Sequence, residues 1–184
     1  CREAGISPGA LYVYFASKED LIAGIVERDR AKLASELAEL SSAPDLLDAL
    51  AKLGEHYAVE RPHYKSVLGI EIGGEATRNP AVGATFRSVD VFCRQSFEQV
   101  FARARHDGKI TPEEDPKTLA EVVSLIGDGL FWRRAVDPDF DVHKMMPILV
   151  RIVSMLLNPV GPAVLSADPA PDRAAARPKT EASP

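Results

Sequence analysis

The sequence predicts an all-α protein. Over most of residues 17–157, apolar side chains recur three and four positions apart, which is the period of an amphipathic helix. Prolines, and serine or aspartate at N-cap positions, separate these segments, and no stretch shows the strict alternation of a convincing β-strand. We therefore expect short helical elements near the N-terminus, followed by a larger helical bundle.

Size and composition are compatible with one or two globular domains. The chain has 184 residues, of which 46% are hydrophobic and 27% are charged, and no apolar run is long enough to cross a bilayer. The two cysteines, Cys1 and Cys93, do not suggest a disulfide framework, so we expect a cytoplasmic protein without a membrane partner. Because the sequence starts with Cys1 inside a motif, we expect that residues are missing before it.

The first elements are two helices joined by minimal turns. Gly5 suits a turn, Ser7 is a good N-cap, and proline is accepted at the first position of a helix over Pro8–Phe15. Within it, Leu11 and Phe15 are four positions apart and can face a core. Ser17 is a second N-cap and opens a longer helix. Two helices this close together have the shape of a helix-turn-helix reader of DNA.

The longer helix and its successors follow from apolar spacing. The helix that Ser17 opens runs to a break at 41–44 and passes a charged patch at 27–30, so we expect it to join two domains. Further helices are predicted over 46–57, 64–72, 81–107, 116–135 and 141–157. Pro147 predicts either a kink or a late start in the last one. Residues 158–184 are rich in alanine and proline and are expected to be disordered.

The N-terminal motif resembles that of the TetR family of bacterial transcriptional regulators. The residues that carry the resemblance are Ala4-Gly5-Ile6-Ser7, Leu11-Tyr12-x-Tyr14-Phe15 and Ser17-Lys18-Glu19-x-Leu21. It implies a partial helix-turn-helix DNA-binding domain at 1–26 and a ligand-binding and dimerisation domain at 27–157, before the tail at 158–184. It also implies a ligand-responsive homodimer, most often a repressor, acting on a palindromic operator in double-stranded DNA.

The same resemblance assigns DNA contacts. Base-facing or groove-facing positions are Pro8, Gly9, Ala10, Tyr12 and Val13, phosphate-facing positions are Tyr14 and Lys18, and Ser7 opens the helix that carries them. Since proline and alanine offer no side-chain donor, the two tyrosines and the lysine are expected to make most contacts. The net charge is −5 and no basic stripe is present near the motif, so the DNA hypothesis depends on the motif and not on charge.

A pocket for a small-molecule effector is expected inside the larger bundle, again by resemblance. Its apolar lining could come from Tyr57, Tyr64, Phe86, Val89, Phe92 and Cys93, with Glu71 or Asp90 as a polar anchor. For each of these residues, ordinary packing in the core is the alternative.

A dimer interface is expected on the last two helices, which pair in the resembling family with those of a second subunit. The candidate residues are Val123, Ile126, Gly127, Leu130, Trp132, Leu149, Ile152, Val153 and Leu156. The alternative is that these helices only complete the core of one subunit.

Enzymatic and metal-dependent functions have little support. The sequence has no Gly-rich phosphate loop, Gly-x-Ser-x-Gly elbow or Cys-x-x-Cys, so we expect no catalytic residue, no cofactor and no metal. Glu60 and His63 have the Glu-x-x-His spacing of di-iron bundles, but the motif occurs once and contains Pro62. The alternative function is a helical small-molecule or metal-binding protein, built around Glu60, His63 and Glu71, without a role at DNA.

Overall fold

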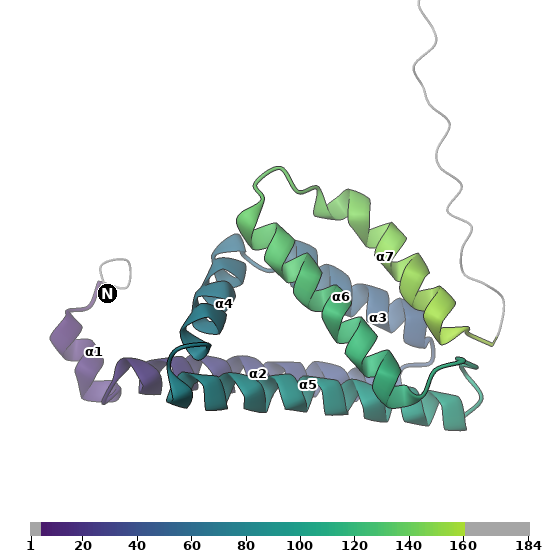
Figure 1. Ribbon diagram of the computed structural model, residues 1–184, viewed down its shortest axis with the longest axis horizontal. Coiled ribbons are helices and arrows are strands. Elements are labelled where there is room, and N and C mark those ends of the chain that lie inside the picture. Colours follow the sequence, from purple (N-terminus) through teal and green to yellow (C-terminus); the bar gives the residue numbers. More distant parts are fainter. Residues whose placement is uncertain (1–4, 161–184) are drawn as a thin grey trace, which may run out of the picture.

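A computed structural model describes residues 5–160 and is all-α (Figure 1), which confirms the predicted fold class. The helices are α1 Pro8–Tyr14, α2 Lys18–Ser42, α3 Leu46–Glu55, α4 His63–Ala76, α5 Pro80–His106, α6 Pro116–Val136 and α7 Val142–Leu157, with a π-helical turn, η1, at His56–Glu60. Within residues 5–160 no β-strand forms, and a single bridge pairs Ile110 with Pro159. Residues 1–4 and most of the expected tail at 158–184 lie outside the described residues.

Several helices begin at residues whose side chains cap them, among them the predicted caps Ser7, Ser17 and Asp115. Ser7 Oγ accepts a hydrogen bond from the N–H of Ala10 at 3.1 Å, and Ser17 Oγ accepts one from Asp20 at 3.1 Å. Asn79 caps α5 and Asp115 caps α6 in the same way. Each cap satisfies backbone donors that a helix start leaves unpaired. Gly5, with φ at +64°, forms the turn before α1.

The long helices α2 and α5 lie side by side and run in the same direction (Figure 1). Helix α4 packs on α5 and α6, and α6 in turn packs along α5. Helices α3 and α7 contact one another, and they pack on α2 and α6, respectively. The short helix α1 lies at the N-terminal end of α2, outside the packed helices (Figure 1).

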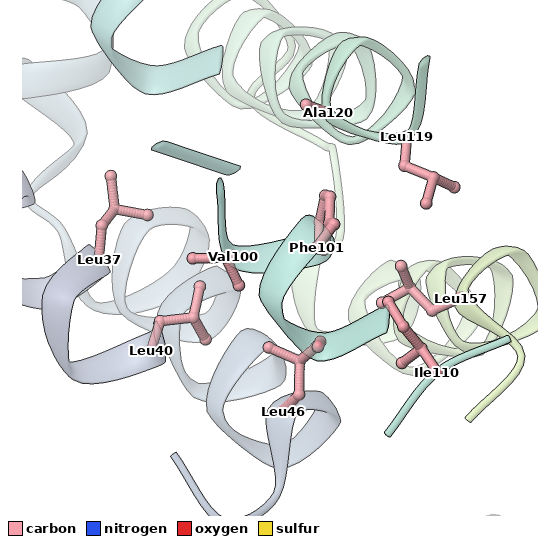
Figure 2. Packing of buried hydrophobic residues seen from close by; sticks show 10 residues of the cluster. Leu37, Leu40, Leu46, Val100, Phe101, Ile110, Leu119, Ala120 and Leu157 are labelled. Carbon is pink, nitrogen blue, oxygen red and sulfur yellow. The ribbon is translucent and has the colours of Figure 1, made fainter. Parts of the chain in front are cut away.

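A large core cluster (Figure 2) lies where the C-terminal ends of α2, α5 and α7 meet, away from α1 (Figure 1). Phe101, Ile110, Leu119 and Leu157 are completely or almost completely buried there. The full cluster is Leu37, Leu40, Leu46, Val100, Phe101, Ala104, Ile110, Leu119, Ala120 and Leu157. It draws on α2, α3, α5, α6 and α7, and its burial supplies the main hydrophobic contribution to folding.

A small core cluster lies nearer α1. It consists of Ile22, Ile72 and Val82, with Val26, Leu68 and Ala76 packed around them. These residues belong to α2, α4 and α5, so the first turns of α2 are held by the two helices that meet at residues 76–80. Helix α2 passes the predicted domain boundary at 26/27 without interruption. The domain division itself remains a prediction.

Two local features differ from the regular pattern. The helical stretch predicted over 46–57 is α3 followed by the wide turn η1, whose carbonyls at Tyr57 and Val59 accept hydrogen bonds from Arg134. Apolar spacing does not distinguish such a turn from an α-helix, because a single π-helical turn continues the axis of the helix before it and shifts the spacing by only one residue. Helix α7 starts at Val142, so Pro147 lies inside it and the late start is excluded.

Candidate nucleic-acid interface

Helix α1 has one held face and one exposed face. The ring of Phe15 lies on α2 beside Gly24, where a Cβ would come within 3.1 Å of the ring, and Leu11 is half-buried. On the other face the exposed fractions are 62% for Tyr12, 79% for Val13 and 82% for Tyr14. Adjacent exposed apolar and aromatic side chains of this kind indicate a surface that contacts another molecule.

The other residues with an expected DNA role lie around the same helix. Ser7 and Gly9 are exposed, Ala10 is half-buried, and Pro8 opens α1. Lys18 stands in the first turn of α2, and its side chain is 66% exposed. The structure therefore brings all eight expected DNA-contact residues into one short segment, although their contacts with DNA remain a prediction.

The surroundings of this segment are more acidic than a usual DNA-binding surface. Glu19 follows Lys18 and accepts a hydrogen bond from the Asn79 amide at 2.8 Å, and Glu75 of α4 lies 3.7 Å from the Lys18 ammonium. A backbone N–H and then the Asn79 amide hold the pKa of Glu19 below its usual range. Both carboxylates are thus charged at neutral pH; Glu19 belongs to the N-terminal motif, whereas Glu75 was not singled out by the sequence.

The residues expected to line an effector pocket are spread over several environments. Tyr57 is half-buried and donates its hydroxyl to Glu36 at 2.6 Å, whereas Tyr64 and Glu71 are exposed on α4. Phe86 lies against Gly73, and the half-buried ring of Phe92 is 5.6 Å from the Arg30 guanidinium; Val89 is also half-buried. The structure does not gather these side chains around one common space.

Asp90 and Cys93 belong to a polar group between α5 and α6. Arg94 donates to Asp90 at 2.9 Å and also to Glu121 of α6. Burial raises the pKa of the Cys93 thiol to about 11, and the carboxylates of Asp90 and Asp128 add to this effect. The sequence analysis did not name Arg94, Glu121 or Asp128. The i,i+4 spacing of Asp90 and Arg94 was a signal by which the ion pair between these two could have been predicted.

A shallow hollow lies elsewhere, where the end of α2 meets the start of α3 and the end of α5. Its lining residues are Leu40, Ser41, Ala43, Leu46, Val100, Arg103, Ala104, Asp107 and Lys109. It shares no residue with the expected effector pocket, whose location therefore remains a prediction.

An apolar face lies on α6 and α7. Large hydrophobic side chains exposed on these two helices are Leu125, Trp132, Val136, Ile148, Ile152 and Met155, and Met155 reaches an exposed fraction of 74%. The backbone at Gly127 and Gly129 is open as well, because a Cβ there would meet no atom within 4 Å. Such a face on two neighbouring helices is typical of a surface that packs against a partner.

This face includes only part of the expected dimer interface. Trp132 and Ile152 are exposed on it, and Ile126, Leu130 and Leu149 are half-buried. Gly127 is exposed but lies two positions from Leu125, so it points to another side of α6. Val123, Val153 and Leu156 instead pack against the large core cluster. The sequence reasoning missed Leu125, Val136, Ile148 and Met155, which are apolar positions on the side of each helix away from that cluster.

The Glu-x-x-His motif does not form a metal site in the described part of the chain. Glu60 lies in η1, where its carboxylate oxygen is 2.9 Å from His56 Nδ1. His63 is the first residue of α4. Over residues 5–160, no group of three or more His, Cys, Asp or Glu side chains could hold a metal ion. The helices of the same range also include none long and apolar enough to cross a membrane.

Comparison with known proteins gives two family matches. The family model described as BetI-type transcriptional repressor, C-terminal, matches residues 59–158. The model described as bacterial regulatory proteins, tetR family, matches residues 1–25. Together they cover the α1 segment and most of the helical bundle.

Individual proteins similar to this chain include two that are named as transcriptional regulators. The chain is 27% identical over 113 residues to the HTH-type transcriptional regulator UidR of Escherichia coli K12, which covers 61% of this chain and 57% of UidR. Among solved structures, Salmonella enterica GusR has a TM-score of 0.68 at 24% identity and covers 85% of this chain and 81% of its own. A putative TetR-family regulator from Rhodococcus sp. has a TM-score of 0.70 at 18% identity, covering 84% and 83%.

Proposed function

The chain belongs to the TetR family of bacterial transcriptional regulators, and on this basis we propose that it binds operator DNA through α1, as a homodimer. The family membership agrees with the resemblance seen in residues 4–21, and regulators of this family are not enzymes. The match to UidR covers little more than half of that protein, so what the whole protein binds is part of the proposal. The observation that carries it is the exposed face of α1, formed by Tyr12, Val13 and Tyr14.

The proposed contacts follow from how α1 is held. Phe15 fixes the helix on α2, so its free face can enter the major groove with its N-terminal residues toward the base edges. The hydroxyls of Tyr12 and Tyr14 can donate to bases or phosphates, and Ala10 can contact a thymine methyl. Lys18 stands at the start of α2, where its ammonium and the first backbone N–H groups favour a phosphate.

A second subunit is proposed to cover the apolar face of α6 and α7. Two reading helices one turn of DNA apart are needed for a palindromic site, which requires a two-fold dimer. The exposed side chains on this face, among them Leu125, Trp132 and Met155, are large and apolar enough to be stabilised by burial against a copy of themselves.

Regulation is proposed to follow from two states of the dimer. A small molecule that binds the bundle more tightly in one state shifts the population toward it. If that state separates the two copies of α1 by a distance that does not fit successive major grooves, the operator is released and repression ends.

The DNA-binding proposal is tested by replacing Tyr12 and Tyr14 together with alanine in the full-length protein. Loss of two major contacts is expected to weaken operator binding by at least about thirtyfold, with the circular dichroism spectrum unchanged. Fluorescence anisotropy with labelled DNA from the gene's own upstream region measures the affinity. Val91→Ala, which truncates an exposed apolar residue of α5, is the control and should bind like the parent.

Two results would contradict the DNA-binding proposal. The first is an absence of specific binding by the parent protein at moderate salt. The second is unchanged operator affinity in the double variant, because the exposed face of α1 would then not be the reading surface.

The dimer is tested with Met155→Glu, which places a charge on the apolar face. Burying an unpaired carboxylate is costly, so sedimentation velocity should show a shift from dimer to monomer. Val91→Glu introduces the same charge at an exposed apolar position outside that face and should remain dimeric. A parent protein that is monomeric at micromolar concentration would contradict the proposal.

A further inference from the structure

The corner between α4 and α5 lies against the start of α2, next to the reading helix. Glu75, in the last turn of α4, has its Oε2 atom 3.7 Å from the Lys18 ammonium and 2.8 Å from a guanidinium nitrogen of Arg78. One carboxylate oxygen thus faces two cations, one from the DNA-binding segment and one from the bundle. This ion-pair arrangement, which we call the Glu75 cluster, consists of Lys18, Glu75 and Arg78.

The three side chains differ in their access to solvent. Lys18 and Arg78 are 66% and 71% exposed, whereas only 19% of the Glu75 side chain is exposed. The hydrogen bond from Arg78, with a smaller contribution from the charge of Lys18, holds the pKa of Glu75 below its usual range. The carboxylate is therefore charged at neutral pH, and the two cations can move while it stays in place.

The position of Glu75 relative to α2 is set by close packing. Asn79 caps α5 and also donates to Glu19 in the first turn of α2, at 2.8 Å. A Cβ on Gly83 would come within 2.7 Å of the Ala76 carbonyl oxygen, so α5 approaches the end of α4 closely. Beneath them, Ile22 and Ile72 belong to the small core cluster. A shift of α4 or α5 would therefore move the Glu75 carboxylate relative to Lys18.

We propose that the Glu75 carboxylate competes with DNA phosphate for Lys18, so that the α4–α5 corner limits how tightly the protein binds the DNA backbone. The inference rests on the proposed function, since it requires Lys18 to meet a phosphate. In the unbound protein the ammonium pairs with Glu75, and on DNA it turns to the phosphate while Arg78 keeps the carboxylate neutralised. The Lys18 ammonium is largely exposed and lies 3.7 Å from the carboxylate, so the pair is weak and phosphate displaces it at a modest cost.

Removing the charge of Glu75 and removing the charge of Arg78 should therefore change DNA affinity in opposite directions. Without the charge of Glu75, Lys18 has no partner to leave and DNA affinity rises. Without Arg78, Lys18 is the only cation paired with the carboxylate and affinity falls. Because phosphate contacts carry no sequence information, both changes should apply equally to operator and unrelated DNA.

The experiment measures affinity for operator and for unrelated duplex with the full-length protein at about 0.05 M and about 0.3 M salt. Glu75→Gln is expected to raise affinity for both duplexes by about two- to fivefold at the lower salt, and Arg78→Gln to lower it by a similar factor. Both effects should shrink at the higher salt, because screening weakens exposed charge pairs. Thermal unfolding of each variant reports whether the fold is retained.

Two controls separate competition for Lys18 from a general effect of charge. Glu113→Gln removes one negative charge from an exposed loop at the other end of α5 and should leave DNA affinity unchanged. In a Lys18→Gln background, Glu75→Gln should give no gain, because the pair no longer exists.

The outcomes distinguish this inference from the proposed function. A parent protein that binds no DNA overturns both. A parent that binds operator, with Glu75→Gln unchanged or weaker, overturns the competition alone. A gain from Glu75→Gln that persists in the Lys18→Gln background also overturns it, since the carboxylate would then act on the DNA directly.

Discussion

The two ends of α2 are attached to the rest of the molecule very differently. Near α1, Ile22 joins only Ile72 and Val82 in the small core cluster. Toward its C-terminal end, Leu37 and Leu40 belong to the large core cluster, which draws on four other helices and the loop after α5. One continuous helix thus has a sparsely packed end beside α1, called the thin end, and a densely packed end far from α1, called the thick end.

At each end of α2, a neutral side chain from the bundle donates a hydrogen bond to a glutamate of α2. Asn79 donates to Glu19 at the thin end, and Tyr57 donates to Glu36 at the thick end. Between them, Arg61 of the bundle pairs with Asp29 at 2.7 Å. Local opening has the lowest free-energy cost where few apolar contacts must be broken. We therefore expect α1 to change position at the thin end, without unfolding of the bundle.

The largest effect is expected from Phe101→Ala, in the centre of the large cluster. The side chain is fully buried, and truncating such a residue leaves a cavity, so the free energy of unfolding should fall by about 3–5 kcal/mol. Urea denaturation monitored by circular dichroism measures the change. Val91→Ala, at an exposed position of the same helix, should change it by less than about 0.5 kcal/mol.

Ile72→Ala probes the small cluster and should cost less, about 2 kcal/mol, because fewer side chains surround the deleted atoms. Its distinguishing effect is local. Amide hydrogens in the first turns of α2 should lose protection from exchange, while those around Leu37 and Leu40 keep theirs. Equal loss of protection along the whole helix would show that the two ends do not open separately.

Much of the fold could be predicted because its signals are local. Ser7, Ser17 and Asp115 mark helix starts through their own side-chain hydrogen bonds, and apolar spacing marks the length of each helix. The turn η1 could not be predicted, since Arg134 satisfies its carbonyls from a helix more than seventy residues away. The cap at Asp141 is a local signal of the same kind, and it starts α7 before Pro147, which excludes the late start.

The sequence predicted those features of the candidate site that depend on residues close together in the chain, but not the contacts between residues far apart. The exposed face of α1 follows from the spacing of Leu11 and Phe15, which face α2 and leave Tyr12 and Tyr14 outside. The contact of Glu75 with Lys18 joins residues 57 positions apart, and periodicity carries no information about such a pairing. For the same reason the sequence did not separate exposed Leu125 and Met155 from Val153, which packs inward.

Asn79→Ala tests the polar contact at the thin end and should cost about 1.5 kcal/mol. The change removes the cap of α5, which satisfies the N–H groups of Ala81 and Val82, together with the hydrogen bond to Glu19. Thermal unfolding measures the loss, and hydrogen exchange should show a looser start of α2. Asp115→Ala removes the cap of α6, which starts beside the large core cluster and not beside the small one, and should leave exchange at the start of α2 unchanged.

Tyr57→Phe tests the matching contact at the thick end and should have the smallest effect, about 0.5–1 kcal/mol. Burial, and then the hydrogen bond to Glu36, raise the pKa of Tyr57 above its usual range, so the hydroxyl keeps its proton and donates at neutral pH. After the change, Glu36 still has the Lys32 ammonium at 3.4 Å and the ring of residue 57 still packs. Because the large cluster holds this end independently, hydrogen exchange at residues 18–26 should stay as in the parent. Faster exchange there would mean that a contact at the thick end alters the local stability of the thin end. A bundle contact far from α1 would then affect the segment beside α1 through α2 alone.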